Sequence, residues 1–259
     1  GGGILSSWGT MDFAGGIVVH ATAGTAALVT ALTLGKRRGF PKSITPPHSP
    51  ILTMIGASML WIGWFGFNAG SALGANGGAG MAMLVTHISA ATASLVWMFI
   101  EWKRFGKPSL IGIVTGMVAG LATVTPASGY IGVPGGLILG FFGGLLCYLA
   151  VDFIRGKLQI DDSLDVFAVH GVGGILGTLL VAFLATSTFS GLGLAEGQTA
   201  VSQFFVQLKA VILTVVWTSV FTYLMLKITS FIVPLRVDEQ EEIEGLDLRS
   251  HGEKGYHSD

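Results

Sequence analysis

The chain has 259 residues, of which 51% are apolar and only 11% are charged. Its mean hydropathy is +0.70, whereas soluble domains have about a quarter of their residues charged. This composition excludes an ordinary soluble domain and indicates a protein embedded in a lipid bilayer. The net charge is −1, and because no long basic stretch could neutralise phosphates, a nucleic-acid partner is not expected.

Seven apolar runs are candidates for membrane-spanning helices. A hydrocarbon core of about 30 Å takes roughly 20 apolar residues as a helix, and lipid cannot hydrogen-bond a bare backbone, so each run must be helical. The predicted spans are Phe13 to Leu34, Ile51 to Ser71, Gly80 to Trp102, Leu110 to Thr125, Gly135 to Phe153, Val166 to Ala185 and Phe204 to Val233. The predicted fold class is therefore an all-α polytopic membrane protein with seven transmembrane helices.

The cations fall in alternate loops, which predicts how the chain crosses the membrane. Lys and Arg in short loops stay on the cytoplasmic side. They follow the first, third and fifth spans, as Lys36, Arg37, Arg38 and Lys42, then Lys103, Arg104 and Lys107, then Arg155 and Lys157. The amino terminus is thus predicted outside and the C-terminus in the cytoplasm. We divide the chain into a membrane domain, residues 1–235, and an acidic cytoplasmic tail, residues 236–259.

Two histidines inside apolar spans belong to similar motifs. Asp12 precedes His20 in the first span and Asp165 precedes His170 in the sixth, with small residues after each histidine. The first span starts outside and the sixth inside, as in the inverted repeats of transporters, whose working site lies near the midplane. A rise of about 1.5 Å per residue leaves about 10 Å of depth between the imidazoles, within the uncertainty of the boundaries. The two rings can therefore meet and share a proton.

A purely structural interpretation of these polar groups stays open. A lone intramembrane histidine is often only a hydrogen bond between helices. Asp12 and Asp165 stand where a carboxylate accepts orphan backbone N–H groups, so a helix N-cap is the default role for both. For Asp12 that role is compatible with function, because its charge would also attract a cation to the outer mouth.

The second span ends in an aromatic, glycine-rich stretch, Gly63 to Ser71. A Trp near a membrane interface is usually an anchor. Trp64 and Phe67, however, are three residues apart and share one helix face. Such a face can also narrow a lumen or hold a cation over its rings.

These motifs resemble those of the Amt/Mep/Rh family of ammonium transporters, most closely its bacterial and archaeal Amt branch. The resemblance covers essentially the whole chain. It rests on Asp12 to Gly16 continuing through His20 and Gly24 to Arg37, on Gly63 to Ser71, on Thr125 to Tyr130, on Asp165 to His170, and on the tail motifs Glu244-Gly245-Leu246-Asp247 and His251-Gly252-Glu253.

The resemblance implies an eleven-helix fold of two inverted five-helix repeats plus a last helix, assembled as a homotrimer in the cell (plasma or inner) membrane. The seven spans would be the fifth to eleventh helices, so the first four would be missing from a partial transporter domain. The chain starts with Gly1 rather than Met, and no signal peptide is visible before the first span. We therefore expect a chain that is processed or incomplete at its amino terminus.

The resemblance also implies the roles of individual residues. His20 and His170 would be the paired pore histidines, Trp64 and Phe67 would line the pore, and Asp12 would be the acid of a competent site. Ser71 would remain from the outer site that recruits ammonium. Ammonium would be deprotonated there and ammonia would cross a dry pore, with a proton able to follow separately. This is transport rather than enzyme catalysis, and it needs no cofactor or metal.

The tail has an implied partner as well. Its motifs and the basic loops are similar to those on which PII-type signalling proteins dock in this family to block the pore. The residues concerned are Glu244, Gly245, Leu246, Asp247, His251, Gly252 and Glu253. An ammonium sensor that signals through this tail is the main alternative function.

Two further alternatives come from the topology and the polar groups. Seven helices with Lys209 in the last outline a retinal-binding photoreceptor, but its lysine would need a carboxylate counter-ion, and Glu101 lies only at the inner end of the third span. An intramembrane metalloenzyme would use His20, His170 and Asp12. Zinc needs three or four convergent ligands, and Asp12 lies far from His20 along one helix, so this alternative is the weakest.

Overall fold

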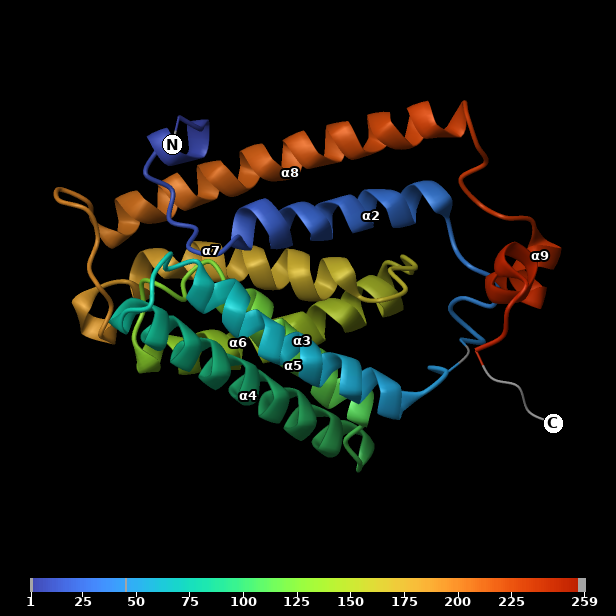
Figure 1. The fold of residues 1–259 in the computed structure, drawn as a ribbon, viewed down its shortest axis with the longest axis horizontal. Helices are drawn as coiled ribbons and strands as arrows, with labels where there is room; N and C mark the ends of the chain where they lie inside the picture. Colours follow the sequence, from blue (N-terminus) through green and yellow to red (C-terminus); the bar gives the residue numbers. More distant parts are fainter. Residues whose placement is uncertain (1, 45, 256–259) are drawn as a thin grey trace.

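The computed structural model describes residues 2–44 and 46–255, and in this part of the chain all regular structure is helical (Figure 1). Six helices are long and apolar enough to cross a membrane, and a seventh apolar helix is shorter. They are η1 with α2 (Gly16–Ala21, Thr22–Leu34), α3 (Pro50–Gly70), α4 (Gly77–Phe105), α5 (Leu110–Val124), α6 with η2 (Val133–Val151, Asp152–Lys157), η3 with α7 (Phe167–Gly171, Val172–Leu184) and α8 (Ala200–Ser230). The predicted helical fold class is confirmed.

Short helices flank these spans. They are α1 (Ile4–Ser7), η4 (Ser187–Phe189), α9 (Glu239–Glu244) and η5 (Asp247–His251). The last two belong to the tail. Successive spans run in opposite directions, so the connections gather at two ends (Figure 1). We call the end with residues 35–44, 46–49, 158–166 and 231–255 the tail end, and the other, with residues 2–15, 71–76, 125–132 and 185–199, the head end.

Capping residues, rather than the limits of the apolar runs, determine where several helices begin. The side chain of Ser49 accepts from the amide of Leu52, directly before Pro50 at the first turn of α3. Thr199 and Ser202 form a capping box at the start of α8, which therefore begins four residues before the predicted Phe204. Since a polar cap satisfies orphan N–H groups at a helix start, it can lengthen a helix beyond its apolar run.

The short helix α5 lies in the middle of the bundle, in contact with α3, α4, α6 and α7. Its glycines explain how α5 packs so closely against its neighbours. A Cβ added at Gly116 would lie 2.8 Å from the carbonyl oxygen of Ala93 in α4, and one added at Gly120 would meet the carbonyl oxygen of Ser89. Without these side chains, the backbones of α4 and α5 approach closely, as small residues allow in membrane helices.

The long helix α8 lies along α2 and α7 at the side of the bundle (Figure 1). Most of its large apolar side chains face outward, including Phe205, Ile212 and Val216. An apolar outer surface of this kind suits lipid, where burial against another helix brings no hydrophobic gain. Three polar side chains of α8 are buried, those of Gln203, Gln207 and Thr218.

Candidate functional site: a buried histidine pair

Asp12 organises the start of the first span. Its carboxylate accepts the backbone N–H groups of Gly15, Gly16, Ile17 and Val18, at 3.2, 2.5, 3.0 and 3.3 Å. Burial raises the pKa of Asp12, and the four amide hydrogen bonds oppose that shift. The predicted capping role of Asp12 is confirmed, in the form of a loop in which one carboxylate satisfies a whole turn of orphan N–H groups.

The predicted capping role of Asp165 is wrong. Asp162 caps the sixth span instead, because its two oxygens accept from the amides of Val166 at 3.0 Å and Phe167 at 2.7 Å. Asp165 has a left-handed backbone, with φ +54°, and its side chain pairs with Arg155 at 3.2 Å. Burial raises the pKa of Asp165 to about 6, against the attraction of Arg155.

With Asp162 as the capping residue, the two spans share one local pattern. The histidine follows the capping aspartate by eight residues in both, as Asp12 with His20 and Asp162 with His170. The third residue after each aspartate is left-handed, at Gly15 with φ +107° and at Asp165. Each histidine then lies in a π-helical turn, η1 or η3. Such turns widen a helix and occur frequently at functional sites.

The first and sixth spans cross at points where glycine is required. A Cβ added at Gly24 would meet the Cα and amide nitrogen of Gly171, and one added at Gly174 would lie 2.6 Å from the Cβ of His20. Backbone atoms cannot move aside as a flexible side chain can. The absence of side chains at these positions therefore permits the approach that places the two histidines together.

His20 and His170 lie in contact, as predicted. Their Nδ1 atoms are 3.3 Å apart, and the ring of Trp64 stacks on His20 with centroids 5.2 Å apart and planes at 17°. The indole nitrogen of Trp64 donates to the hydroxyl of Thr125 at 3.0 Å, which fixes the orientation of this ring. His20 is only 2% exposed, and its Nε2 has no hydrogen-bond partner in the described part of the chain.

An apolar cavity of about 450 Å³ adjoins the histidine pair. Trp64 and Phe67 both line it, so their expected position on one helix face is confirmed. The complete lining is Val19, His20, Ala23, Leu60, Gly63, Trp64, Phe67, Val166 and His170. The imidazoles therefore supply the polar atoms of an otherwise hydrocarbon surface, an arrangement that suits a small hydrogen-bonding solute.

Ser71 is not brought to this cavity. It follows the last residue of α3 at the head end, and its hydroxyl donates to the carbonyl of Phe67 at 2.9 Å. No contact with the histidines therefore supports its predicted role in recruiting ammonium, which stays a prediction. Asp12 is also at the head end, but it is connected to His20 through the first turn of η1.

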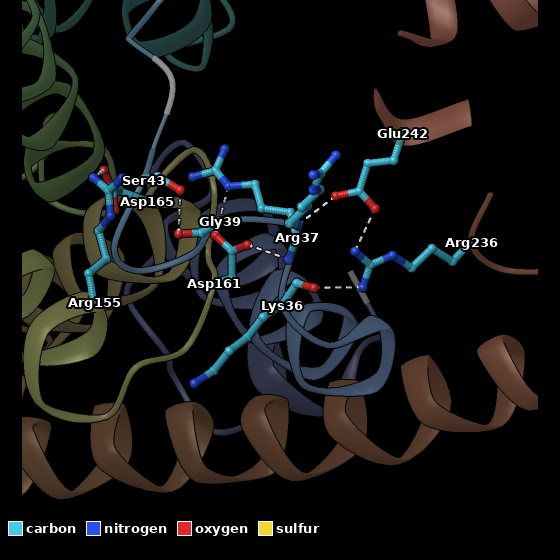
Figure 2. Close-up of polar contacts among 10 residues, drawn as sticks. Lys36, Arg37, Gly39, Ser43, Arg155, Asp161, Asp165, Arg236 and Glu242 are labelled. Atoms are coloured by element: carbon cyan, nitrogen blue, oxygen red, sulfur yellow. Dashed lines mark hydrogen bonds and ion pairs between the residues drawn. The ribbon is translucent and has the colours of Figure 1, made fainter. Parts of the chain in front are cut away.

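The tail lies against the membrane domain at the tail end, as Figure 2 shows. Arg236 donates to the carbonyl of Lys36 at 2.7 Å and pairs with Glu242 at 2.7 Å. Glu242 also accepts the backbone N–H of Arg38 at 2.6 Å, the main reason why its pKa is lowered. The adjacent Arg37 pairs with Asp161, directly before the capping residue Asp162. A continuous polar network therefore links the tail to the start of the sixth span.

The predicted tail motifs occupy the two short tail helices and the turn between them. Glu244 ends α9 and pairs with Arg249 at 3.3 Å, and Gly245, with φ +96°, turns the chain into η5. Leu246 reaches a cleft shared with the membrane domain. Asp247 and His251 bound η5, and Gly252 and Glu253 follow it.

Two sets of residues that position the site were not predicted from the sequence. Asp162 could have been found from its spacing to His170, which repeats the spacing of Asp12 to His20. Gln203 and Gln207 were not singled out, although they are uncharged polar residues inside an apolar span, and such residues usually face a partner in the bundle.

The fold and the site together define a class: a polytopic helical membrane protein in which two oppositely directed helix starts bring a histidine pair to an apolar cavity. Residues 1–256 match the family model described as Ammonium Transporter Family. The chain belongs to this family.

Named relatives are similar over nearly the whole chain. The chain is 49% identical to "Ammonium transporter Amt1" of Archaeoglobus fulgidus, with 99% of the chain and 65% of the relative covered. It is 45% identical to "Ammonium transporter" of Aquifex aeolicus, with 99% and 59% covered. It therefore spans less than two thirds of the length of these relatives. Both are named as transporters, not enzymes.

Solved structures show the same fold. A protein described as "Sensor Amt Protein" matches with a TM-score of 0.87 and 32% identity, over 95% of this chain and 62% of that one. Candida albicans Mep2 matches with a TM-score of 0.82 and 36% identity, over 93% and 55%. The retinal-binding interpretation has no support from these matches. The amino group of Lys209 lies instead 3.5 Å from the centre of the Trp8 ring.

Proposed function

We propose that the chain forms the part of an ammonium transporter in which ammonia passes the His20–His170 pair as a neutral molecule. One observation carries the proposal: the two imidazoles share a contact at 3.3 Å beside an apolar cavity, and the Nε2 of His20 has no partner among the described residues. A buried polar atom without a partner is costly unless something binds it. A passing hydrogen-bonding solute would satisfy it.

The chemistry of the pair fits ammonia. When one neutral ring donates its Nδ1–H to the Nδ1 of the other, the donor ring keeps a bare Nε2 and the acceptor ring carries an Nε2–H. The pair then offers one acceptor and one donor, whichever ring donates. Ammonia can use both, since it has N–H groups and one lone pair.

An apolar cavity also favours the neutral form of the solute. Moving an uncompensated charge from water into such a site costs at least several kcal/mol. Ammonium avoids this cost by releasing a proton before it enters, whereas a metal cation such as potassium cannot. Asp12, with its charge at the head end, is the residue we assign to a competent outer mouth, and Ser71 marks the outer end of α3.

The orientation and assembly that we propose follow from the cation-rich loops and from the family. Loops with Lys and Arg favour the cytoplasmic side, so the tail would lie in the cytoplasm and the head end outside, in the plasma or inner membrane. A homotrimer and a PII-type partner on the tail complete the proposal. A sensor function is not favoured, because the relatives that are 49% and 45% identical are named ammonium transporters, whereas the structure described as a sensor is 32% identical.

The test is ammonium flux in proteoliposomes of the full-length gene product, per folded protein. We expect the double substitution His20→Ala with His170→Ala to change flux and its dependence on pH. The matched control is His87→Ala, because His87 is exposed on α4 and contacts the rings of Trp61 and Phe65, away from the cavity lining. If flux in the double variant were unchanged, the proposed role of the histidines in proton handling would be wrong.

A further inference from the structure

Two buried glutamines of α8 hold a stretch of chain outside the histidine pair. Gln207 is 0% exposed and Gln203 is 3% exposed, although both lie on a helix whose other large side chains mostly face outward. Burying a side-chain amide in apolar surroundings is unfavourable unless hydrogen bonds satisfy it. The partners of these amides therefore indicate what they are for.

The side chain of Gln207 forms hydrogen bonds with both backbone polar groups of Met11, as a neighbouring β-strand would. Its Oε1 accepts the N–H of Met11 at 2.8 Å, and its Nε2 donates to the carbonyl of Met11 at 2.6 Å and to that of Thr178 in α7 at 3.0 Å. Gln203 supports this arrangement, since its Nε2 donates to the carbonyl of Gly9 at 3.0 Å and to Oε1 of Gln207 at 3.2 Å. Both polar groups of Met11 thus depend on one side chain.

Met11 directly precedes Asp12, so Gln207 controls where the Asp12 carboxylate lies. On the other side of Asp12, the N–H of Phe13 donates to the carbonyl of Pro126 at 2.9 Å. Fixed on both sides, Asp12 holds the amide of Gly15 and those of the first three residues of η1, and His20 lies two residues further along the same helix. A continuous series of contacts therefore leads from α8 to the histidine pair.

We propose that Gln207 is a positioning residue for the His20–His170 pair, acting through Met11 and Asp12, with Gln203 as a second brace. As a role in transport this rests on the proposed function. The role of Gln207 in placing the imidazoles does not depend on the proposed function.

The first test is Gln207→Leu in the full-length gene product. Leucine has a similar volume but leaves the N–H and C=O of Met11 without their partner, and an unpaired buried group shifts an equilibrium by about tenfold or more. We expect ammonium flux per folded protein to fall about tenfold. The matched control is Gln198→Leu, because Gln198 is exposed before α8 and, among the described residues, its side chain accepts only from the hydroxyl of Ser202. Flux in Gln198→Leu should stay unchanged.

The second measurement separates positioning from stability. The ¹⁵N NMR signals of the imidazoles report whether the Nδ1 atoms share a proton. We expect this signature in the wild type and in Gln198→Leu, and its loss in Gln207→Leu. A purely structural role would lower the unfolding temperature of Gln207→Leu and leave the signature and the flux per folded protein intact, and that result would overturn the proposal.

Two possible outcomes of these tests need a second variant or a second measurement. If Gln207→Leu does not fold, Gln203→Leu removes only the bonds to Gly9 and to Gln207; we expect about a threefold loss of flux and a partial loss of the signature, because one brace remains. A wild-type signature and flux in Gln203→Leu would then contradict the proposal. If the wild type carries no ammonium, the proposed function fails, while the NMR signature in the Gln207 and Gln203 variants still decides the positioning role.

Discussion

The segments 12–24 and 162–174 use the same local design but are held in place differently. Each has a capping aspartate, a left-handed residue three positions later and a histidine in a π-helical turn. The first is braced at the head end by Gln207 of α8, through Met11. The second is braced at the tail end by Arg37, through Asp161. The geometry around the histidines is thus repeated, while its support comes from different helices at opposite ends of the bundle.

This difference indicates which distant contacts each of the two segments depends on. Arg37 follows the C-terminal end of α2, so the first segment's own helix leads to the brace of the second. The first segment depends on α8. A perturbation at the tail end should therefore reach His170 more directly than His20, and a perturbation of α8 should do the reverse.

The largest expected effect is at the glycine crossing. In Gly24→Ala the new methyl meets backbone atoms of Gly171, whereas in Gly171→Ala it meets mainly the side chain of Phe167, at 2.9 Å. Because a side chain can move and a backbone cannot, we expect a loss of about 3 kcal/mol in unfolding free energy for Gly24→Ala and about 1 kcal/mol for Gly171→Ala. Denaturation in detergent measures both.

The control for this pair is Gly80→Ala on α4, where an added Cβ has no neighbour within 4 Å. It should not destabilise the protein, and it should raise the free energy of unfolding by at most about 1 kcal/mol because alanine favours a helix over glycine. Equal losses for Gly24→Ala and Gly171→Ala would contradict the asymmetry of the crossing.

The second expected effect compares the two capping aspartates. Asp12→Ala leaves four amides without an acceptor and Asp162→Ala leaves two. Loss of a cap typically costs between about 0.5 and 2 kcal/mol, so we expect about 2 kcal/mol for Asp12→Ala and about 1 kcal/mol for Asp162→Ala. The measurement is the same denaturation series, with Asp165→Ala as the control that removes a carboxylate without removing a cap. A greater loss for Asp162→Ala would reverse our ranking of the two caps.

The smallest expected effect is a dependence of stability on pH. It comes from the left-handed residue of the second segment, because Asp165 is titratable and its counterpart in the first segment is a glycine. Burial raises the pKa of Asp165 to about 6 from an ordinary value of 3.8, while Gly15 occupies the matching place in the first segment. Between these values the folded protein retains a proton that the unfolded chain has released. The free energy of unfolding should therefore fall as pH rises through this interval.

This dependence is measured by thermal unfolding between about pH 4 and about pH 7. Asp165→Asn should reduce the slope, because asparagine does not titrate. A stability that rises with pH in the wild type and not in Asp165→Asn would show that the Arg155 pair outweighs burial at this site.

Much of the fold followed from the sequence because lipid leaves few choices. Seven apolar runs had to be helices, and the depth of two histidines on opposite sides allowed them to meet, which the 3.3 Å contact confirms. The residues that turn the chain before each span were harder to predict. Asp165 was expected to cap because it lies next to the apolar run, but it takes a left-handed conformation and Asp162 caps from further away.

Residues with remote partners were beyond the reach of local patterns. Gln207 contacts Met11, which lies 196 residues earlier in the chain, and nothing near either residue indicates the other. The same holds for Arg236 and the carbonyl of Lys36, which are 200 residues apart. Caps and helix periods operate over a few residues, whereas these contacts exist only once the bundle is assembled.

The π-helical turn at His20 also sets the rotational phase of everything that follows it. Each residue of an ordinary helix advances the side chain by about 100°, and η1 holds Gly16–Ala21 in a wider turn before α2 continues to Leu34. If the same residues wound as an ordinary α-helix, with none deleted, the rest of α2 would be rotated by about 100°, because the wider turn holds about one residue more than an α-helical turn. Side chains such as Leu32, which now face outward, would turn inward. The length of this turn is thus as much a part of the site as the residues within it.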